Sequence, residues 1–204
     1  MTIEQLLAEC DIVRASSEKL AQCNPFSCDD EDLDEFFAKD CIVNQKRLLG
    51  KTYLFVLKKS PNTIVSAFSL SNDSIRLTNR ITDEYKELFL DDTDLRDKTL
   101  KRFPAVLIGR LGTNKDFARR GYGTAIMDFI KVLFRTNNRT GCRFIIVDAL
   151  NRPETLHYYK KNGFRYLIDD EQLEAKYIGI GVNRLPLNTR LMYFDLLKIK
   201  VNED

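Results

Sequence analysis

The chain has 204 residues, of which 44% are hydrophobic and 30% charged, and its formal net charge is +2. This composition is typical of a folded globular domain. No apolar run approaches the roughly 20 residues that span a bilayer, and no basic region precedes an apolar one at the N-terminus, so we expect neither a membrane helix nor a signal peptide. The single histidine excludes a His-rich metal site, and five cysteines without metal-ligand spacing predict reduced thiols in a cytoplasmic protein.

Hydrophobic patterns predict strands and helices that mix around one central sheet. The predicted strands are residues 10–16, 51–59, 63–71, 103–113, 142–150, 165–168 and 189–197. The second and third strands form a hairpin closed by Ser60-Pro-Asn. Helices are predicted after Ser27, after Gly121, and from Pro153 to Gly163, because serine caps a helix start, proline suits a first helical position and glycine suits a C-cap. This order predicts an α/β or α+β fold.

Charge is distributed unevenly along the chain. Residues 101–165 hold 14 Lys and Arg residues against four acidic ones, a net charge of +10, so the remainder carries −8. A basic region of this kind attracts a polyanion. No repeat or linker interrupts the sequence, so we expect a single domain over residues 1–204, with the charged stretch 76–102 interpreted as an insertion.

The stretch Arg-Arg-Gly-Tyr-Gly over residues 119–123 stands directly before an amphipathic helix. The apolar residues of that helix recur at helical spacing: Ile126, Phe129, Ile130, Leu133 and Phe134. A helix N-terminus exposes unpaired N–H groups and a partial positive charge. Glycines let the backbone approach a ligand, and the arginines add charge. The stretch therefore predicts a phosphate site, most naturally for a pyrophosphate.

Two other phosphate-binding motifs fit less well. A Walker A loop is excluded, because Gly-Lys-Thr at 50–52 lacks a glycine five residues earlier and leads into a strand. A dinucleotide-binding turn would use Gly121-Tyr-Gly123, with Asp148 for the ribose. Ile126 takes its third glycine position, and the preceding strand ends too far upstream, near Thr113.

Arg120-Gly-Tyr-Gly123-Thr-Ala125 fits the pattern R/Q-x-x-G-x-G/A and resembles motif A of the GNAT superfamily, the acyl-CoA N-acyltransferases. His157-Tyr-Tyr-Lys-Lys-Asn-Gly-Phe164 resembles the end of motif B in that family, Y-x-x-x-G-F, with Tyr159 at the tyrosine position. The resemblance spans residues 50–165. Residues 26–45 are similar to the branch that includes acetyltransferase toxins of toxin–antitoxin pairs. The resemblance implies a mostly antiparallel, twisted sheet with splayed central strands, flanked by helices.

The resemblance also implies direct transfer of an acetyl group from acetyl-CoA to a primary amine. It places the pyrophosphate on Arg119, Arg120, Gly121, Tyr122, Gly123, Thr124 and Ala125. The backbone of Leu111, Gly112 and Thr113 is expected to meet the pantetheine and the acetyl carbonyl. Asn151 stands where the family often has a cofactor-contacting asparagine. Tyr159 is the candidate general acid that protonates the leaving thiolate.

The general base is less evident. Many relatives use a glutamate on the strand before motif A, but here that strand reads Ala-Val-Leu-Ile-Gly-Arg-Leu-Gly and holds no acid. Asp73 is one candidate, and water or an amine that is already neutral are the alternatives. His157 lies two residues before Tyr159 on a predicted helix, so we expect it to point away from the tyrosine.

The acceptor is a small-molecule or protein amine or, as the alternative that the toxin branch implies, the amino group of aminoacyl-tRNA. An aminoacyl amine has a lowered pKa, and the basic region could hold tRNA phosphates. An antitoxin partner would accompany that alternative, and the family resemblance is compatible with a homodimer. Two other classes stay open: a non-catalytic CoA-sensing domain, and a nucleic-acid-binding module, although no helix-turn-helix or RNA-binding signature is found.

Overall fold

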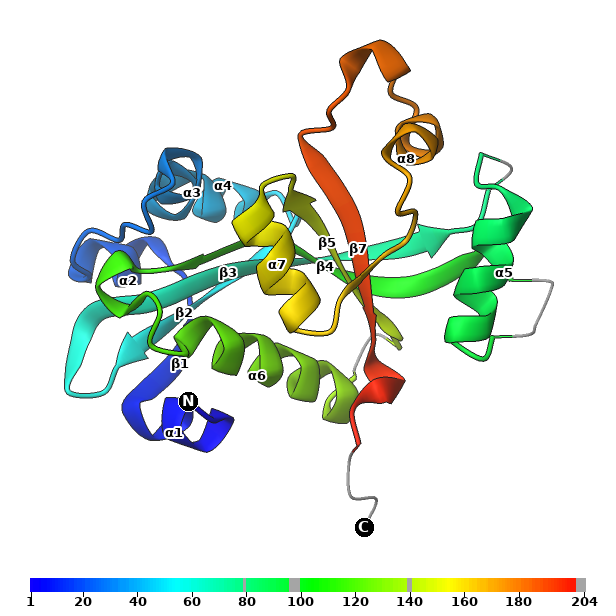
Figure 1. The fold of residues 1–204 in the computed structure, drawn as a ribbon. Coiled ribbons are helices and arrows are strands. Elements are labelled where there is room, and N and C mark those ends of the chain that lie inside the picture. The colour runs from blue at the N-terminus through cyan, green and yellow to red at the C-terminus, as the bar shows by residue number, and fades with distance from the viewer. Residues whose placement is uncertain (79, 96–99, 139–140, 201–204) are drawn as a thin grey trace. The chain divides into compact units, whose positions relative to one another are not determined.

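The computed structural model describes residues 1–78, 80–95, 100–138 and 141–200 (Figure 1). The chain forms two compact units. The first comprises Met1–Asn72 and Ile108–Leu133, and the second comprises Asp73–Leu107 and Phe134–Asp204. The expectation of a single domain with an insertion at 76–102 stays a prediction, and residues 79 and 96–99 of that stretch lie outside the described residues.

The described residues form helices and strands in mixed order. In chain order they are α1 (Ile3–Glu9), β1 (Cys10–Arg14), α2 (Ser17–Gln22), α3 (Glu31–Glu35), a π-helical turn (Phe36–Asp40), α4 (Cys41–Lys46), β2 (Lys51–Leu57), β3 (Ser60–Arg76), α5 (Asp83–Asp92), β4 (Arg102–Thr113), a 3₁₀ turn (Lys115–Phe117), α6 (Tyr122–Thr136), β5 (Phe144–Leu150), α7 (Pro153–Lys161), β6 (Arg165–Tyr166), α8 (Glu171–Ile178), a 3₁₀ turn (Val182–Arg184), β7 (Thr189–Asp195) and a last 3₁₀ turn (Leu196–Lys198). No described helix is long and apolar enough to cross a membrane.

The seven strands form one sheet in the order β1-β2-β3-β4-β5-β7-β6. β1 with β2, β2 with β3, β5 with β7 and β6 with β7 are antiparallel. β4 and β5 are parallel, and their pairing among the described residues covers only Ala105–Leu107 and Phe144–Ile146, although both strands continue. The mixed, mostly antiparallel fold predicted from the sequence is confirmed.

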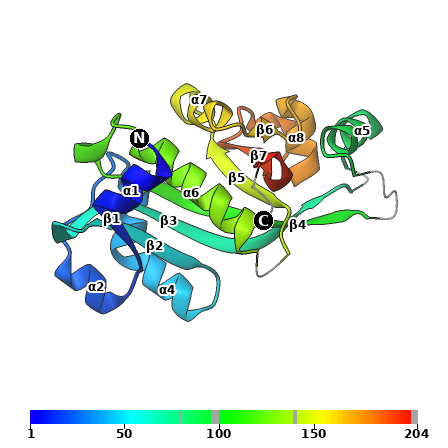
Figure 2. The ribbon, with the colours of Figure 1, turned by 90° about the horizontal axis from the view of Figure 1, so that it is seen from below.

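The first unit is layered, with strands β1 to β3 between two sets of helices (Figure 2). α1 and α6 lie on one side of these strands, and α2 and α4 lie on the other. Alternation along β2 explains the layering, because successive side chains of a strand point to opposite faces. Leu54 and Val56 share a buried cluster with Phe37 of the π-helical turn, whereas the Phe55 ring contacts Phe129 of α6 with centroids 5.3 Å apart.

The helix predicted after Ser27 begins later than expected. Asp30 is the N-cap of α3, and its carboxylate accepts a hydrogen bond from the backbone N–H of Leu33. The Ser27 hydroxyl instead donates to Asp34 at 2.7 Å. The prediction of Ser27 as the cap is therefore wrong, since a run of acidic residues offered several caps and tertiary contacts selected one.

The hairpin of β2 and β3 is confirmed, but its turn is not Ser60-Pro-Asn. Leu57 pairs directly with Ser60, so Lys58 and Lys59 form the turn. β3 is also much longer than predicted, because it continues to Arg76 beyond the apolar run that revealed it.

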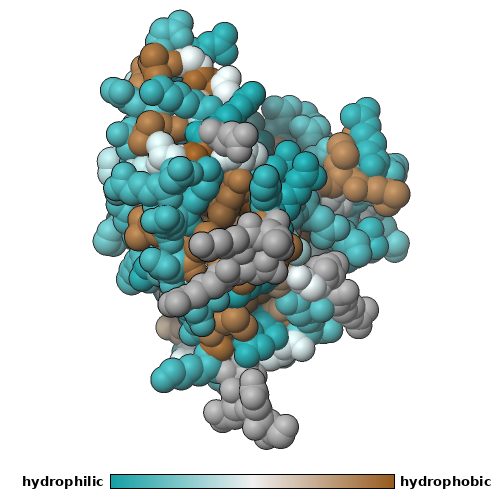
Figure 3. Space-filling model, turned by 90° about the vertical axis from the view of Figure 1, so that its right-hand side faces the viewer, coloured by the Kyte–Doolittle hydropathy of each residue, from teal (hydrophilic) through white to brown (hydrophobic). Residues whose placement is uncertain are grey.

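Aromatic packing builds the core of the second unit. The Phe89 ring of α5 lies 5.3 Å from Phe144 of β5 and 5.2 Å from Tyr193 of β7, measured between centroids. α8 is fixed by a buried ion pair in which Arg190 donates to Glu174 at 2.5 Å. On the face of this unit that carries α5, small hydrophobic areas alternate with hydrophilic side chains (Figure 3).

Candidate active site

The loop from β4 to α6 is held tightly within the first unit. The side-chain amide of Asn114 donates to the carbonyl of Ile64 at 3.0 Å, and its backbone N–H donates to Val65 at 2.9 Å. The backbone N–H of Lys115 donates to Ser27 at 2.9 Å. These bonds fix the beginning of the loop, so the residues that follow it stand in a defined position before α6.

The backbone at the end of this loop has left-handed geometry at two residues. Arg119 has φ +60° and Gly121 has φ +88°, and α6 begins at the next residue, Tyr122. Glycine adopts this region without steric cost, whereas an arginine there is uncommon. A side chain at Gly121 would lie 3.1 Å from the backbone nitrogen of Met1. Arg119 and Arg120 are both exposed, so their charges stand beside the N-terminus of a 15-residue helix. This combination can bind an anionic group.

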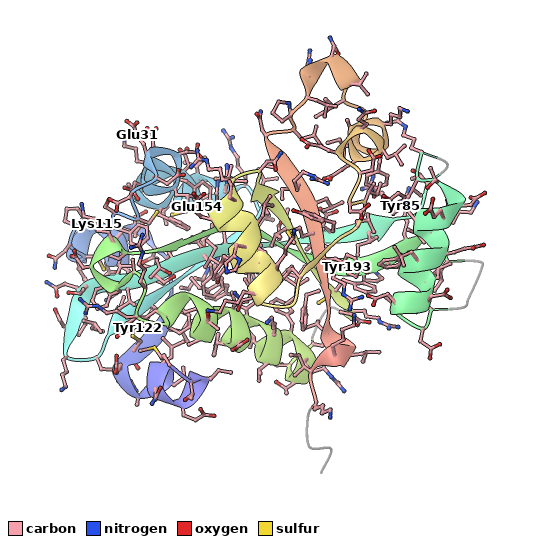
Figure 4. The ribbon with its side chains drawn as sticks, in the orientation of Figure 1. Glu31, Tyr85, Lys115, Tyr122, Glu154 and Tyr193 are labelled. Atoms are coloured by element: carbon pink, nitrogen blue, oxygen red, sulfur yellow. The ribbon has the colours of Figure 1, made fainter. Side chains whose placement is uncertain are left out.

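Tyr122 anchors the start of α6 to α1. Its hydroxyl donates to the Glu9 carboxylate at 2.5 Å, and its ring meets Phe117 edge-on with centroids 5.5 Å apart (Figure 4). The Arg120 guanidinium lies over the same Phe117 ring, 5.9 Å from its centroid. Burial, reinforced by the Glu9 carboxylate, raises the pKa of Tyr122 to about 12. The Tyr122 side chain is thus committed to holding the loop. Glu9 is a residue that the sequence analysis missed, because it lies far from the loop in sequence and carries no local signal.

The remaining residues assigned to the loop differ in exposure. Gly123 and Thr124 are partly exposed, while Ala125 is fully buried. Their role in cofactor binding stays a prediction.

The end of β4 approaches the segment before α3 closely. The carbonyl of Gly112 accepts a hydrogen bond from the Ser66 hydroxyl at 2.6 Å. A side chain at Gly112 would lie 3.0 Å from the Cys28 sulfur, so only glycine fits this approach without displacement of a neighbour. Leu111 and Thr113 on either side are half-buried. The role of these three residues toward pantetheine and carbonyl stays a prediction.

Tyr159 lies in the second unit, on α7. Pro153 opens this helix as predicted, but the helix ends at Lys161 with Asn162 as its C-cap, and the predicted cap Gly163 follows with φ +80°. Tyr159 is 8% exposed, and its ring packs edge-on against Tyr158 and Phe164 with centroids 5.2 and 5.3 Å away. Burial alone raises the pKa of Tyr159 above its usual value. Among the described residues, no hydrogen bond of its hydroxyl is found. His157 is exposed, so the two side chains point in different directions as expected.

Asn151 is bound into the second unit. Its side-chain nitrogen donates to Glu171 at 3.0 Å and to the carbonyl of Leu187 at 2.8 Å. Both N–H groups of the amide are therefore used, and only its oxygen is left for a ligand. The assignment of Asn151 to the cofactor stays a prediction.

One carboxylate of the second unit stands close enough to another to raise its pKa. Asp73 of β3 is exposed and accepts a hydrogen bond from the backbone N–H of Ser74 at 2.7 Å. Asp148 of β5 reaches solvent as well, yet partial desolvation, followed by the charge of Asp73, raises the pKa of its carboxyl. A raised pKa makes a carboxylate a better proton acceptor. The sequence signal for Asp148, an acid at the end of a buried strand, was considered only for ribose binding.

No protein-family model matches the chain, and no curated protein sequence matches it. Solved structures do resemble it. A tyrosine-to-phenylalanine variant of KacT has a TM-score of 0.66 at 14% identity, covering 93% of this chain and 96% of that one. AtaT complexed with acetyl-methionyl-tRNAfMet gives the same TM-score, identity and coverage.

A third solved structure holds a tyrosine-to-phenylalanine variant of the AtaT toxin bound to acetyl-CoA and to the C-terminus of the antitoxin AtaR. Its TM-score is 0.60 at 15% identity, covering 93% of this chain and 95% of that one. At these identities the likeness concerns the fold alone: the chain folds like KacT and AtaT along 93% of its length, which agrees with the mixed, mostly antiparallel α/β fold predicted from the sequence.

Proposed function

We propose that this chain is an N-acetyltransferase that moves the acetyl group of acetyl-CoA directly to the amino group of an acceptor. One observation carries the proposal. The anion-binding loop at residues 119–123 opens α6 in a fold that the chain shares over 93% of its length with AtaT, a toxin solved with acetyl-CoA. Low sequence identity is no objection, because the loop depends on backbone geometry and on two arginines rather than on an extended set of side chains.

The first unit binds the cofactor in this proposal. The N–H groups at the start of α6 and the charges of Arg119 and Arg120 hold the pyrophosphate, and the Glu9–Tyr122 hydrogen bond keeps the loop in place. Backbone N–H groups at Leu111 and Thr113 serve the pantetheine and the acetyl carbonyl. Such donors stabilise the negative charge that the carbonyl oxygen gains when the amine attacks.

Tyr159 of α7 is the general acid in this proposal. As the C–S bond breaks, the thiolate takes the proton of the Tyr159 hydroxyl. A phenol with a raised pKa transfers this proton only to a basic thiolate, and desolvation raises the pKa of a thiolate as it does that of a phenol. Solved variants of KacT and AtaT carry phenylalanine in place of a tyrosine, which is in keeping with this assignment.

The proton that the amine loses passes to Asp73 or to Asp148. Asp148 is a better proton acceptor than an ordinary carboxylate because its pKa is raised. Water takes this role if the amine arrives neutral. Neither carboxylate is a strong general base. An aminoacyl ester is therefore the acceptor that fits best, because its amine is less basic than a lysine side chain and loses its proton more easily. AtaT, solved with acetyl-methionyl-tRNAfMet, supports aminoacyl-tRNA as the second, more specific proposal. An antitoxin would then be the expected partner, as AtaR is for AtaT. Self-association as a homodimer stays a prediction.

The test is release of the free CoA thiol from acetyl-CoA in the presence of a panel of amines that includes bulk aminoacyl-tRNA. Wild type is compared with Tyr159→Phe, and Tyr158→Phe is the matched control that removes the neighbouring hydroxyl. We expect release that requires an acceptor, collapses in Tyr159→Phe and persists in Tyr158→Phe. Acetyl-CoA binding without release by any acceptor would favour a CoA sensor, and absence of binding would contradict the assignment of the loop.

A further inference from the structure

The first unit has a cavity that none of the glycine-loop residues lines. Its volume is about 400 Å³, and it lies between the end of β1, the beginning of α2 and the last turns of α4. The lining residues are Arg14, Ala15, Ser16, Ser17, Ile42, Gln45 and Lys46. α2 and α4 cover the side of the strands opposite to α6, so this cavity lies on the other face from the loop (Figure 2).

A buried glutamine fixes one wall of the cavity. Gln45 is 8% exposed, and its side-chain nitrogen donates to the carbonyl of Ala15 at 3.0 Å. Its oxygen accepts from Nε of Arg14 at 3.1 Å and from the backbone N–H of Thr52 at 3.4 Å. Gln45 thereby holds the Arg14 guanidinium in one orientation through its Nε atom. The two Nη groups of Arg14 are left for another partner.

The charges of the cavity are not neutralised by the protein. Within the part of the chain that the structure describes, the Nη groups of Arg14 and the ammonium group of Lys46 form no hydrogen bond or ion pair. The lining holds two cationic side chains and two serine hydroxyls, and no carboxylate belongs to it. The Ser16 hydroxyl oxygen accepts a hydrogen bond from the backbone N–H of Lys19, since Ser16 is the N-cap of α2. The hydroxyl proton of Ser16 can still be donated.

From this geometry we propose that the cavity binds a phosphate group. An oriented arginine offers two parallel N–H donors that match two oxygens of a phosphate, and the lysine supplies a point charge. The serine hydroxyls can donate to the remaining oxygens of a tetrahedral anion. A carboxylate has only two oxygens, so it would leave these hydroxyls unused. A ligand charge between −1 and −2 balances the two cations. Ala15 and Ile42 add an apolar side to the cavity, against which a carbon skeleton next to the phosphate can pack.

The phosphate can belong to a polynucleotide backbone or to a small phosphorylated molecule. The inference does not rest on acetyl transfer, because none of the lining residues takes part in the proposed cofactor site. A protein that fails to bind acetyl-CoA would still bind phosphate here.

The experiment is a titration of the ¹⁵N-labelled full chain with inorganic phosphate, followed by NMR at the side-chain amide of Gln45. We expect a saturable shift with a Kd of about 1 mM in the wild type. Arg14→Gln should weaken binding at least about tenfold, because it removes the bidentate donor and one charge. Lys59→Gln is the matched control, since Lys59 is an exposed lysine of the β2–β3 turn, outside the cavity lining. It should leave the shift unchanged.

The source of the phosphate is distinguished by two further measurements on the same proteins. If a polynucleotide backbone is the ligand, Arg14→Gln lowers the slope of log Kd against log salt for tRNA by about one, and Lys59→Gln does not. If a small molecule is the ligand, that slope is unchanged and glycerol 3-phosphate binds more tightly than inorganic phosphate.

Lys46→Gln and Ser17→Ala provide the same test if Arg14→Gln does not fold. The proposal is overturned if the Gln45 amide does not respond to phosphate up to about 50 mM. An equal loss of binding in Lys59→Gln would also overturn it, because the response would then reflect general charge.

Discussion

Tyr122 and Tyr159 are buried to a similar degree, one in each unit, with 6% and 8% of their surfaces exposed. The surroundings of their hydroxyls differ. The Tyr122 hydroxyl donates to a carboxylate, whereas the contacts found for the Tyr159 side chain among the described residues are those of its ring with Tyr158 and Phe164. Burial raises the pKa of both hydroxyls; the Glu9 carboxylate adds to this rise for Tyr122, whereas burial is the one cause of the rise for Tyr159.

This difference separates two uses of a tyrosine. A hydroxyl bound to a carboxylate is an anchor, because breaking this part-buried hydrogen bond leaves both polar groups without their partner. A hydroxyl that forms no hydrogen bond among the described residues loses none when it gives up its proton, although desolvation raises its pKa so that only a strong base takes that proton. The exposure of the whole residue therefore does not separate the two tyrosines, whereas the partner of the hydroxyl does.

Replacing each of the two tyrosines in turn by phenylalanine gives the largest expected difference in kinetics. Tyr159→Phe should lower kcat by about 10²- to 10⁴-fold, the usual contribution of a general acid, with little change in the KM for acetyl-CoA. Tyr122→Phe should instead raise that KM, because the loop loses its anchor, and leave kcat nearly unchanged. Steady-state CoA release measures both. Circular dichroism melting controls for folding, and equal kcat losses in the two variants would abolish the contrast.

The geometry of the anchored loop should have the next largest effect. Gly121→Ala places a side chain at φ +88° and 3.1 Å from the backbone nitrogen of Met1, so the loop must shift. We expect the KM for acetyl-CoA to rise about tenfold, since backbone strain of this kind costs about 1–2 kcal/mol.

Gly141→Ala is the matched control for this substitution. Gly141 also has positive φ, at +70°, but no atom of the described residues lies within 4 Å of a Cβ placed there. It should lower the melting temperature without changing KM. A KM that rises equally in both variants would mean that general destabilisation, rather than loop position, determines cofactor binding.

The carboxylate that anchors Tyr122 should have a smaller effect. Glu9→Gln keeps a hydrogen bond but removes its charge, so the KM for acetyl-CoA should rise about threefold to tenfold. The exposed Glu18 of α2 offers the control Glu18→Gln, which should behave as wild type.

Glu9→Gln should also change how the free energy of unfolding depends on pH in the alkaline range. The pKa of Tyr122 is about 12 in the folded protein, against about 10 in an unfolded chain. The folded state holds this proton more tightly, so its stabilising contribution is complete below pH 10 and is lost as the pH rises through 12. Glu9→Gln should make this alkaline loss smaller, as urea unfolding at successive pH values will measure. A larger loss in Glu9→Gln than in wild type would contradict the role of the carboxylate.

The smallest expected effect is an absence of change. Because the pKa of Tyr159 lies above the ordinary value of about 10, kcat should not fall between pH 7 and about 9.5 through loss of its proton. The opposite outcome is a fall of kcat centred near pH 8 in wild type that is absent from the residual activity of Tyr159→Phe. It would show that Tyr159 ionises at a much lower pH than its burial implies.

Much of the fold was predictable because its signals are local. An apolar run predicts β4, glycines predict the turn that follows it, and a period of 3.6 residues predicts α6. Pro153 and Gly163 predict α7. The short helices α1, α2 and α8 were missed, since six to eight residues give little periodicity. Ser27 was assigned as a cap on a local rule, and the contact of its hydroxyl with Asp34 overrode that rule.

The sequence by itself determined the order of the strands, the backbone turn before α6 and the place of Tyr159 on α7. These depend on steric limits and spacing within a few residues, which every chain with those residues obeys. Only the tertiary structure decided which side chains pair: Glu9 with Tyr122, Gln45 with Arg14, and Asp148 under the influence of Asp73. Desolvation and charge pairing arise between residues far apart along the chain, so they exist only once folding has brought those residues together.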